Sequence, residues 1–163
     1  MNIRNLSPKD YTTIIRVIDE WWGGRKMVDM LPKLYFDHFH NTSFVVEEED
    51  RLVAFLIGFI SPVHQQQGYI HFVGIHPEYR RLGLGRRLYK HFFAFISAQN
   101  CTMVRCITSP INKNSILFHR SMGFQLLTGD VLRDGIPVHT DYDGLGNDRV
   151  VFQRELKTDE IST

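Results

Sequence analysis

The sequence has little of several features that would narrow its class. It holds two cysteines in 163 residues, and no apolar run is long enough to span a bilayer. Cys106 sits inside an apparent strand, so both thiols are expected to be reduced, and neither has further ligands at a spacing suited to a metal. The first residues lack a signal-peptide pattern. These absences predict a cytoplasmic protein with no metal site and no membrane span.

An excess of charge of one sign is also missing. The chain has 19 Lys and Arg against 18 Asp and Glu, a formal net charge of +1. This balance argues against a nucleic-acid coat or a membrane-surface protein. The basic stretch "YRRLGLGRRLYK" raises the alternative of nucleic-acid binding, but it lacks the interleaved exposed aromatics that such a role needs. No nucleic-acid partner is therefore expected.

The length and the hydrophobic fraction, 43%, suit one domain over residues 1–163 with a sizeable core. The hydrophobic patterns predict an alternation of strands and helices. The expected elements are strands at 3–6, 43–48, 52–60, 68–77, 102–108, 124–127 and 149–156, and helices at 7–22, 27–39, 84–99 and 112–122. Pro32 is expected to interrupt the second helix. The order β-α-α-β-β-β-α-β-α-β-β predicts an α/β (α+β) mixed sheet with helices on both faces.

The stretch "VGIHPEYRRLGLGRRLYKHFF" joins a strand to a helix through Arg80-x-x-Gly83-x-Gly85. Glycines let a backbone approach an anion closely, and the start of the helix points free N–H groups at the same place. The surrounding arginines add positive potential, so a diphosphate is the expected guest. The plainer alternative is a capped turn with solvated arginines. Neither the Walker pattern nor the dinucleotide pattern fits.

A second segment, "NKNSILFHRSMGF" at 112–124, follows about thirty residues later. Together the two segments resemble the GNAT superfamily of acyl-CoA-dependent N-acetyltransferases, and the element order is similar over nearly the whole chain. The resemblance implies a GNAT-like domain with a splayed central sheet. It implies direct transfer of an acetyl group from acetyl-CoA to a primary amine of a small molecule or peptide. The family often pairs, so a homodimer stays open. A non-catalytic acyl-CoA-binding sensor or partner module is the alternative.

The resemblance also implies a coenzyme A site. Its implied residues are Val73, Gly74 and Ile75 along the pantetheine arm, Arg80, Arg81, Gly83, Leu84, Gly85 and Arg86 at the diphosphate, and Asn112 and His119 near the pantetheine and the sulfur. Asn112 is in addition suited to cap the helix that follows it.

Two histidines are the candidate catalytic residues. His71 lies where one GNAT branch, the arylalkylamine N-acetyltransferases, has a catalytic histidine, and by strand alternation it is expected on the same side as Tyr69 and Val73. The alternative for His71 is a hydrogen-bonded, half-buried side chain. His119 stands where the family usually has a tyrosine that protonates the leaving thiolate. Our hypothesis is that His119 takes this role, although an imidazole pKa near ~6.5 suits a permanent proton donor less well than a phenol near ~10.

The acceptor side is expected to be formed by "EWWGGRKM" at 20–27 and by the acidic, Gly-rich stretch at 139–148. Trp21 and Trp22 are candidates for an apolar wall, with one of them facing the core and the other the cleft. Arg25 is suited to an acceptor carboxylate, and Tyr142 with its neighbouring aspartates to an ammonium group. The alternative is that these are helix-end and turn residues. The acceptor itself stays open.

Overall fold

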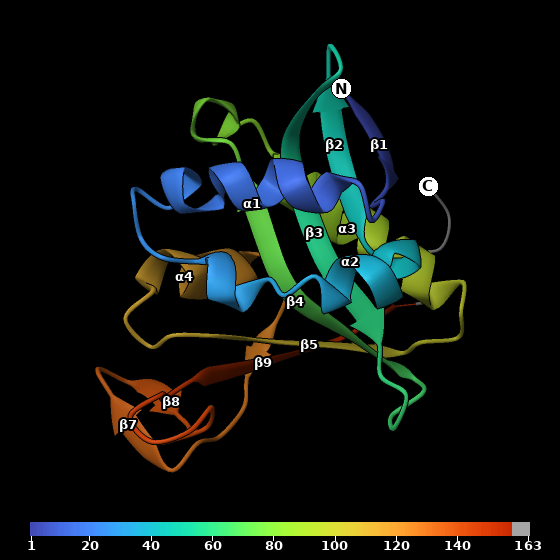
Figure 1. Cartoon of the computed structure of the whole chain (residues 1–163). Coiled ribbons are helices and arrows are strands. Elements are labelled where there is room, and N and C mark those ends of the chain that lie inside the picture. The colour runs from blue at the N-terminus through green and yellow to red at the C-terminus, as the bar shows by residue number, and fades with distance from the viewer. Residues whose placement is uncertain (158–163) are drawn as a thin grey trace.

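A seven-stranded mixed sheet runs through the centre of the molecule in the computed structural model, which describes residues 1–157 (Figure 1). The strand order is β1-β2-β3-β4-β5-β9-β6, and β7 and β8 form a separate hairpin. Among the strands within residues 1–157, only β4 and β5 pair in parallel. The strands are β1 (Asn2–Asn5), β2 (Phe44–Glu48), β3 (Arg51–Ile60), β4 (Gln67–Ile75), β5 (Met103–Thr108), β6 (Gln125–Leu126), β7 (Val131–Arg133), β8 (Ile136–Val138) and β9 (Val150–Glu155).

The helices lie on both faces of the sheet, as the sequence predicts. Helices α1 (Asp10–Trp21) and α2 (Leu34–His38) cover one face, and α3 (Leu84–Ser97) and α4 (Lys113–Ser121) cover the other (Figure 1). Short 3-10 turns complete them: η1 (Val28–Met30), η2 (His40–Thr42) and η3 (Pro77–Tyr79). The second predicted helix is broken at Pro32, where the missing N–H and the fixed φ favour a new start.

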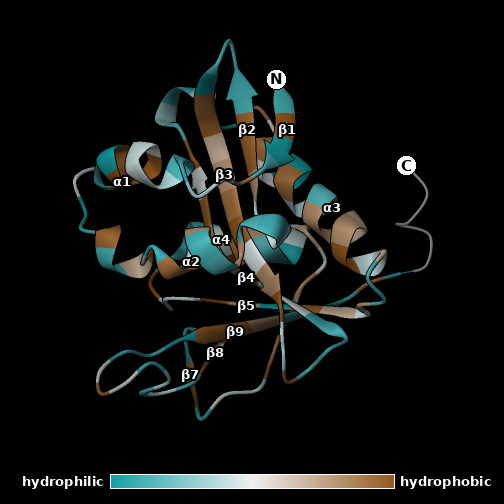
Figure 2. Ribbon diagram, turned by 45° about the vertical axis from the view of Figure 1, so that its right-hand side comes forward, coloured by the Kyte–Doolittle hydropathy of each residue, from teal (hydrophilic) through white to brown (hydrophobic). Residues whose placement is uncertain are grey.

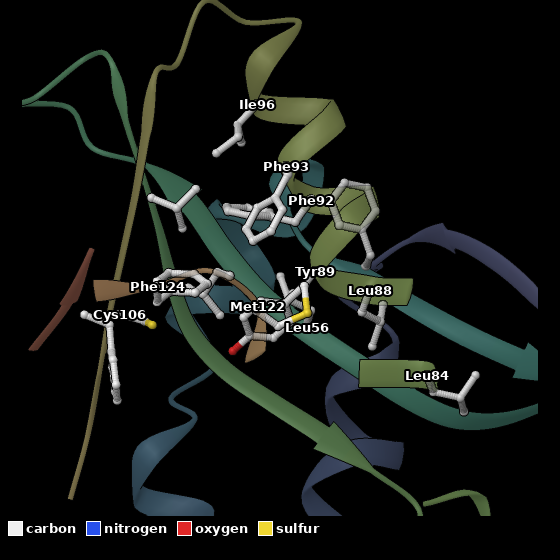
Figure 3. Packing of buried hydrophobic residues seen from close by; sticks show 14 of the residues in the cluster. Leu56, Leu84, Leu88, Tyr89, Phe92, Phe93, Ile96, Cys106, Met122 and Phe124 are labelled. Carbon is white, nitrogen blue, oxygen red and sulfur yellow. The ribbon is translucent and has the colours of Figure 1, made fainter. Parts of the chain in front are cut away.

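Two apolar layers hold the helices to the sheet. On β3, Leu56 packs in the cluster with α3, whereas its neighbours Phe55 and Ile57 pack in the cluster with α1. Because β3 is buried on both faces, it is hydrophobic over most of its length (Figure 2). Each fully buried Leu, Ile or Phe side chain contributes about 1.5–3 kcal/mol. The α3 layer is the larger one and holds Phe92 and Phe93 (Figure 3).

The central sheet is splayed, as expected. Strands β4 and β5 pair over only three positions, from Gln67 with Met103 to Tyr69 with Arg105. Beyond Tyr69, β4 continues along β3, and β5 continues along β9. The two strands therefore separate, and the edges that face the gap are unpaired within the described strands.

A β-bulge lies at His71. The pairing of β4 with β3 passes from Ile70 to Phe72 without a partner for His71. As a result Ile70 packs against the α3 layer, Phe72 against the α1 layer and Val73 again against the α3 layer. The predicted alternation, which put His71 and Val73 on one side, is wrong, because an extra residue re-aims the side chains that flank it.

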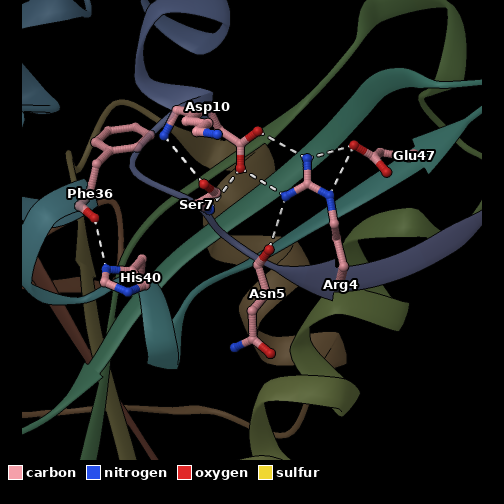
Figure 4. Close-up of polar contacts among 8 residues, drawn as sticks. Arg4, Asn5, Ser7, Asp10, Phe36, His40 and Glu47 are labelled. Carbon is pink, nitrogen blue, oxygen red and sulfur yellow. Dashed lines mark hydrogen bonds and ion pairs between the residues drawn. The ribbon is translucent and has the colours of Figure 1, made fainter.

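A charged network ties β1, β2 and α1 together. The Arg4 guanidinium donates two hydrogen bonds to the Asp10 carboxylate, at 2.8 and 2.9 Å, and lies 2.5 Å from the Glu47 carboxylate (Figure 4). The Ser7 N–H also donates to Asp10 at 2.7 Å. The Ser7 hydroxyl in turn accepts from the Lys9 N–H at 3.3 Å, so Ser7 and Asp10 together cap the turn that leads into α1.

Within residues 1–157, no helix is both long and apolar enough to cross a membrane. In the same range, no group of three or more His, Cys, Asp or Glu side chains is placed to hold a metal ion. Both cysteines are free and buried.

Candidate active site

A cleft of about 820 Å³ opens where β4 and β5 separate. Its walls come from both faces of the sheet, so it passes through the gap between the two strands. Its lining includes Trp22, Arg25, Lys26, Met30, Tyr35, Tyr69, His71, Phe72, Val73, Tyr89, Cys106, Asn112, Ser115, His119, Arg133, Asp143, Asp148 and Arg149. Residues Arg80 to Arg86 are not part of this lining.

The predicted anion loop stands at the start of α3. Gly83 has φ of 79°, a conformation that L side chains rarely adopt, and a Cβ there would meet nothing within 4 Å. Gly85 packs closely, because a Cβ there would lie 3.3 Å from Ile75 and 3.5 Å from Phe118. The first N–H groups of a helix have no intrahelical acceptor, so this loop can hold an anion.

The arginines around the loop differ in what they contact. The Arg80 guanidinium donates to the Trp21 carbonyl at the end of α1 and, at 3.4 Å, to the Ile75 carbonyl. It therefore links the loop to the end of α1. Arg86 lies 3.4 Å from the Ser121 hydroxyl of α4. Arg81 is exposed and has φ of 65°.

The edge of β4 offers its backbone to the gap. Val73 lines the cleft, and the edge that faces β5 beyond Tyr69 is unpaired in the described part of the sheet. Gly74 is required on the opposite face, where a Cβ would lie 2.3 Å from the Phe55 ring. An extended chain in the gap can therefore add to β4 as a further strand does.

His71 lies on the α2 side of the cleft. Its Nε2 is 2.6 Å from the Met30 carbonyl, and its ring stacks on Tyr35 with centroids 4.1 Å apart. A carbonyl only accepts, so Nε2 carries the proton and Nδ1 holds the lone pair. Burial lowers the pKa of His71, although the hydrogen bond to Met30 and the nearby Asp143 act the other way. The ring is therefore neutral at pH 7.

His119 is buried on the α4 side. Its Nδ1 donates to the Ser115 carbonyl at 2.7 Å, and its Nε2 accepts from the Tyr89 hydroxyl at 2.9 Å. Burial lowers the pKa of His119 to about 4, although the Ser115 bond raises it. The structure thus contradicts our hypothesis that His119 donates a proton to sulfur, because the neutral ring has no proton to give on the nitrogen that faces Tyr89.

Asn112 caps α4, as predicted. Its side-chain oxygen accepts from the Ser115 N–H at 3.1 Å. Asn112 also lines the cleft, so its place is compatible with contact to a bound acyl donor.

The two tryptophans face different ways. Trp21 is buried beside Phe55 and does not line the cleft. Its expected acceptor role is therefore wrong, because the last turn of α1 directs it into the core. Trp22 lines the cleft and lies against Phe72 with ring centroids 5.0 Å apart.

Two aspartates of the 139–148 stretch line the cleft, and both are ion-paired. Asp143 binds Arg149 at 2.7 Å, and Asp148 binds Arg133 at 2.5 Å. Tyr142 is exposed, contacts His139 and is not part of the cleft lining, so the structure does not support its expected acceptor role. Because the two aspartates that line the cleft are paired with arginines, they are poorly suited to attract an ammonium group.

Two cationic side chains of the lining, unlike the aspartates, have no ion-pair partner among the described residues. Arg25 and Lys26 both line the cleft, and neither forms an ion pair with any described residue. They follow Gly23 and Gly24, whose positive φ values turn the chain after α1. These two side chains therefore add positive charge to the cleft wall.

Comparison with known families agrees with this architecture. The acetyltransferase (GNAT) family model matches residues 7–124. The chain belongs to this family. GNAT structures of similar fold include an acetyltransferase from Desulfovibrio desulfuricans, with a TM-score of 0.78 and 18% identity over 96% of this chain and 99% of that chain. Diaminobutyrate acetyltransferase from Paenibacillus lautus, solved with its substrate L-2,4-diaminobutyric acid and coenzyme A, has a TM-score of 0.70 and 18% identity over 95% and 94%.

Two curated relatives are similar in sequence over part of this GNAT chain. An L-2,4-diaminobutyric acid acetyltransferase of Halalkalibacterium halodurans is 30% identical over 79 residues, which cover 48% of this chain and 42% of that protein. The Vibrio cholerae protein of the same name is 28% identical over 82 residues, which cover 50% and 47%. The chain thus matches less than half the length of either relative.

For this GNAT protein, the cleft residues that sequence reasoning missed include Tyr35, Tyr89 and Ser115. Tyr89 and Ser115 hold the two nitrogens of His119, and Tyr35 stacks on His71. A signal existed for Tyr89, which follows Gly85 by four positions and so lies on the same helix face. No sequence signal pairs Tyr35 with His71, since that contact depends on the bulge.

Proposed function

We propose that the protein transfers an acetyl group from acetyl-CoA to the primary amine of a small acceptor that also carries a carboxylate. The observation that carries the proposal is the cleft itself, which passes through the splayed sheet and is lined by two cations, Arg25 and Lys26, that form no ion pair within residues 1–157. When bound, acetyl-CoA supplies the activated acyl group. The names of the sequence relatives, diaminobutyric acid acetyltransferases, support an acceptor with both an amine and a carboxylate.

Different residues of the chain have different proposed roles in binding the two substrates. The N–H groups of the Gly83–Arg86 turn hold the diphosphate at the start of α3. The edge of β4 at Val73 and Ile75 orients the pantetheine arm, and the N–H near Val73 or Gly74 polarises the thioester carbonyl. Trp22 and Phe72 shield the acceptor, and Arg25 binds its carboxylate.

His71 is the proposed general base. Nε2 is fixed by Met30 and the ring by Tyr35, so the Nδ1 lone pair has a defined direction. Since the lowered pKa keeps the ring neutral at pH 7, Nδ1 accepts the proton that the attacking amine must lose, directly or through water.

The experiment measures free thiol released from acetyl-CoA with a panel of acceptors: amino acids including diaminobutyrate, polyamines, arylalkylamines, aminoglycosides and N-terminal peptides. We expect turnover with diamino acids and much less with polyamines of equal length. Preference for a polyamine would contradict the carboxylate assignment. Thermal stabilisation by acetyl-CoA without thiol release on any acceptor would instead favour the non-catalytic acyl-CoA-binding alternative.

We also propose a cytoplasmic location and leave a homodimer as a prediction for light scattering.

A further inference from the structure

The hydroxyl of Tyr89 has an unusual place. Tyr89 is 3% exposed, yet it lines the cleft, and it projects from α3 into the cluster that holds Phe93 and Phe124 (Figure 3). Its hydroxyl donates to the neutral Nε2 of His119 at 2.9 Å. A buried Tyr–His pair at a cleft wall is costly unless each polar atom is bonded, and here both are.

Tyr89 also lies on the path that an acyl donor takes. It stands four residues after Gly85, about 6 Å further along α3 on the same face. Cys106 of β5 and the unpaired edge of β4 line the same cleft. A thioester that reaches from the anion loop into the acceptor half of the cleft passes this wall.

We infer that Tyr89 stabilises the leaving thiolate of coenzyme A by a hydrogen bond, and that His119 is a positioning residue that holds the Tyr89 proton until the thiolate forms. This inference rests on the proposed function. In the step concerned, the amine nitrogen bonds to the acetyl carbon, and the carbon–sulfur bond breaks with its electron pair going to sulfur. The amine proton goes to His71 or water, and the thiolate later takes a proton from water.

The Tyr89 hydroxyl can donate its hydrogen bond either to His119 or to the coenzyme A sulfur, and the charge on the sulfur decides between them. A neutral thioester sulfur is a weak acceptor, so the Tyr89 hydroxyl stays on His119 in the ground state. A thiolate carries a full charge and accepts a stronger bond, so rotation about the Tyr89 C–O bond moves the proton to sulfur as the charge develops. An interaction made only in the transition state raises kcat without tightening substrate binding.

The hydroxyl donates a hydrogen bond and keeps its proton. Burial raises the pKa of Tyr89 well above its ordinary value near ~10, whereas a free thiol ionises near ~8.5. Complete proton transfer from Tyr89 to the thiolate is therefore uphill. Tyr89, and not His119, is thus the residue that contacts the sulfur, and it stabilises the thiolate by a hydrogen bond without transferring its proton.

The test measures the thiol pKa of coenzyme A bound to the protein, from the ultraviolet absorbance of the thiolate across a pH series. We expect Tyr89→Phe to raise this pKa by about one unit, equivalent to a tenfold loss of thiolate stabilisation. We expect kcat for acetyl transfer to fall about 10- to 100-fold, with the KM for acetyl-CoA within about twofold. Tyr11→Phe, which lies against Phe36 in the other apolar layer, is the matched control and leaves both values unchanged.

A second variant separates Tyr89 from His119. His119→Leu removes the resting acceptor, so the bound thiol pKa is expected to stay at or fall below the wild-type value. If instead His119→Leu raises the thiol pKa and Tyr89→Phe leaves it unchanged, the inference is overturned. Melting temperatures with and without coenzyme A show that each variant is folded and binds. Failure of wild-type protein to bind coenzyme A would sink the proposed function and not this step alone.

Discussion

At the scale of single residues, the two histidines of the cleft differ in their surroundings more than in their chemistry. Burial lowers the pKa of both. His119 has both nitrogens engaged by Ser115 and Tyr89, whereas His71 has one nitrogen fixed by Met30. Only His71 therefore presents a lone pair with a set direction, and this separates a base from a positioning residue.

The role of His71 leads to a pH prediction. We expect His71→Gln to lower kcat about 100-fold or more, as loss of a general base does. In the wild type, kcat should fall as the pH drops through the His71 pKa, below ~6.5, because the protonated ring cannot accept a proton. The pH profile of kcat for the variant should lack this limb. The exposed His38 serves as the control, and a wild-type limb retained in His71→Gln would exclude His71 as the base.

The cation at the acceptor end leads to a specificity prediction. We expect Arg25→Gln to raise the KM of a diamino acid about tenfold and to leave the KM of acetyl-CoA unchanged, since a charge-assisted hydrogen bond is worth about 1.5–3 kcal/mol. The same change at Arg16, exposed on α1, is the control. Steady-state kinetics check this, and an effect on acetyl-CoA alone would move Arg25 to the donor side of the cleft.

At the scale of elements, the turn into α3 and the splay of β4 from β5 together create the donor half of the site. The glycines of the turn were expected from the sequence, because Arg-x-x-Gly-x-Gly before an amphipathic helix is a local pattern. The bulge at His71 was not expected from the sequence. It arises from the register between β3 and β4, which the alternation of residue types does not record.

Gly83 can be tested against a glycine with the same backbone constraint elsewhere. Gly83→Ala and Gly135→Ala each place a side chain at positive φ, 79° and 75°, with no atom within 4 Å of the new Cβ. Each should lower the free energy of unfolding by about 1–2 kcal/mol. Only Gly83→Ala should raise the KM of acetyl-CoA, as measured by steady-state kinetics. Equal effects of both variants on that KM would remove Gly83 from the diphosphate site.

At the scale of the whole molecule, an ion-pair network joins the first strand to α1 (Figure 4). Although burial alone raises the pKa of Asp10, hydrogen bonds from Arg4 and from the Ser7 N–H outweigh it and lower the pKa. A carboxyl whose pKa is lowered by folding stabilises the folded state fully when the pH is above the unfolded-state pKa, near ~3.9. This stabilisation is lost as the pH falls through the folded-state pKa.

We expect Asp10→Asn to lower the free energy of unfolding at pH 7 by about 1–2 kcal/mol, because the Arg4 fork loses its charged acceptor. Urea denaturation measures this. Asp37→Asn, in the exposed pair with Lys33 at 3.8 Å, should change stability by less than about 0.5 kcal/mol. The difference between the two variants should shrink as the pH drops below ~3.9. A cost for Asp37→Asn equal to that of Asp10→Asn would contradict the special role of the network.

The sequence by itself determined the order of the helices and of the central-sheet strands, though not the β7–β8 hairpin, together with the mixed sheet with helices on both faces, the Gly83–Arg86 turn and the cap at Asn112. These features depend on periodicity, glycine conformation and hydrogen bonds between near neighbours, which a local pattern records. Only the tertiary structure decided that Trp21 is core, that Tyr142 lies off the cleft and that Tyr89 meets His119. Each of these depends on contacts between segments distant in the chain, where strand register and helix packing choose the partner.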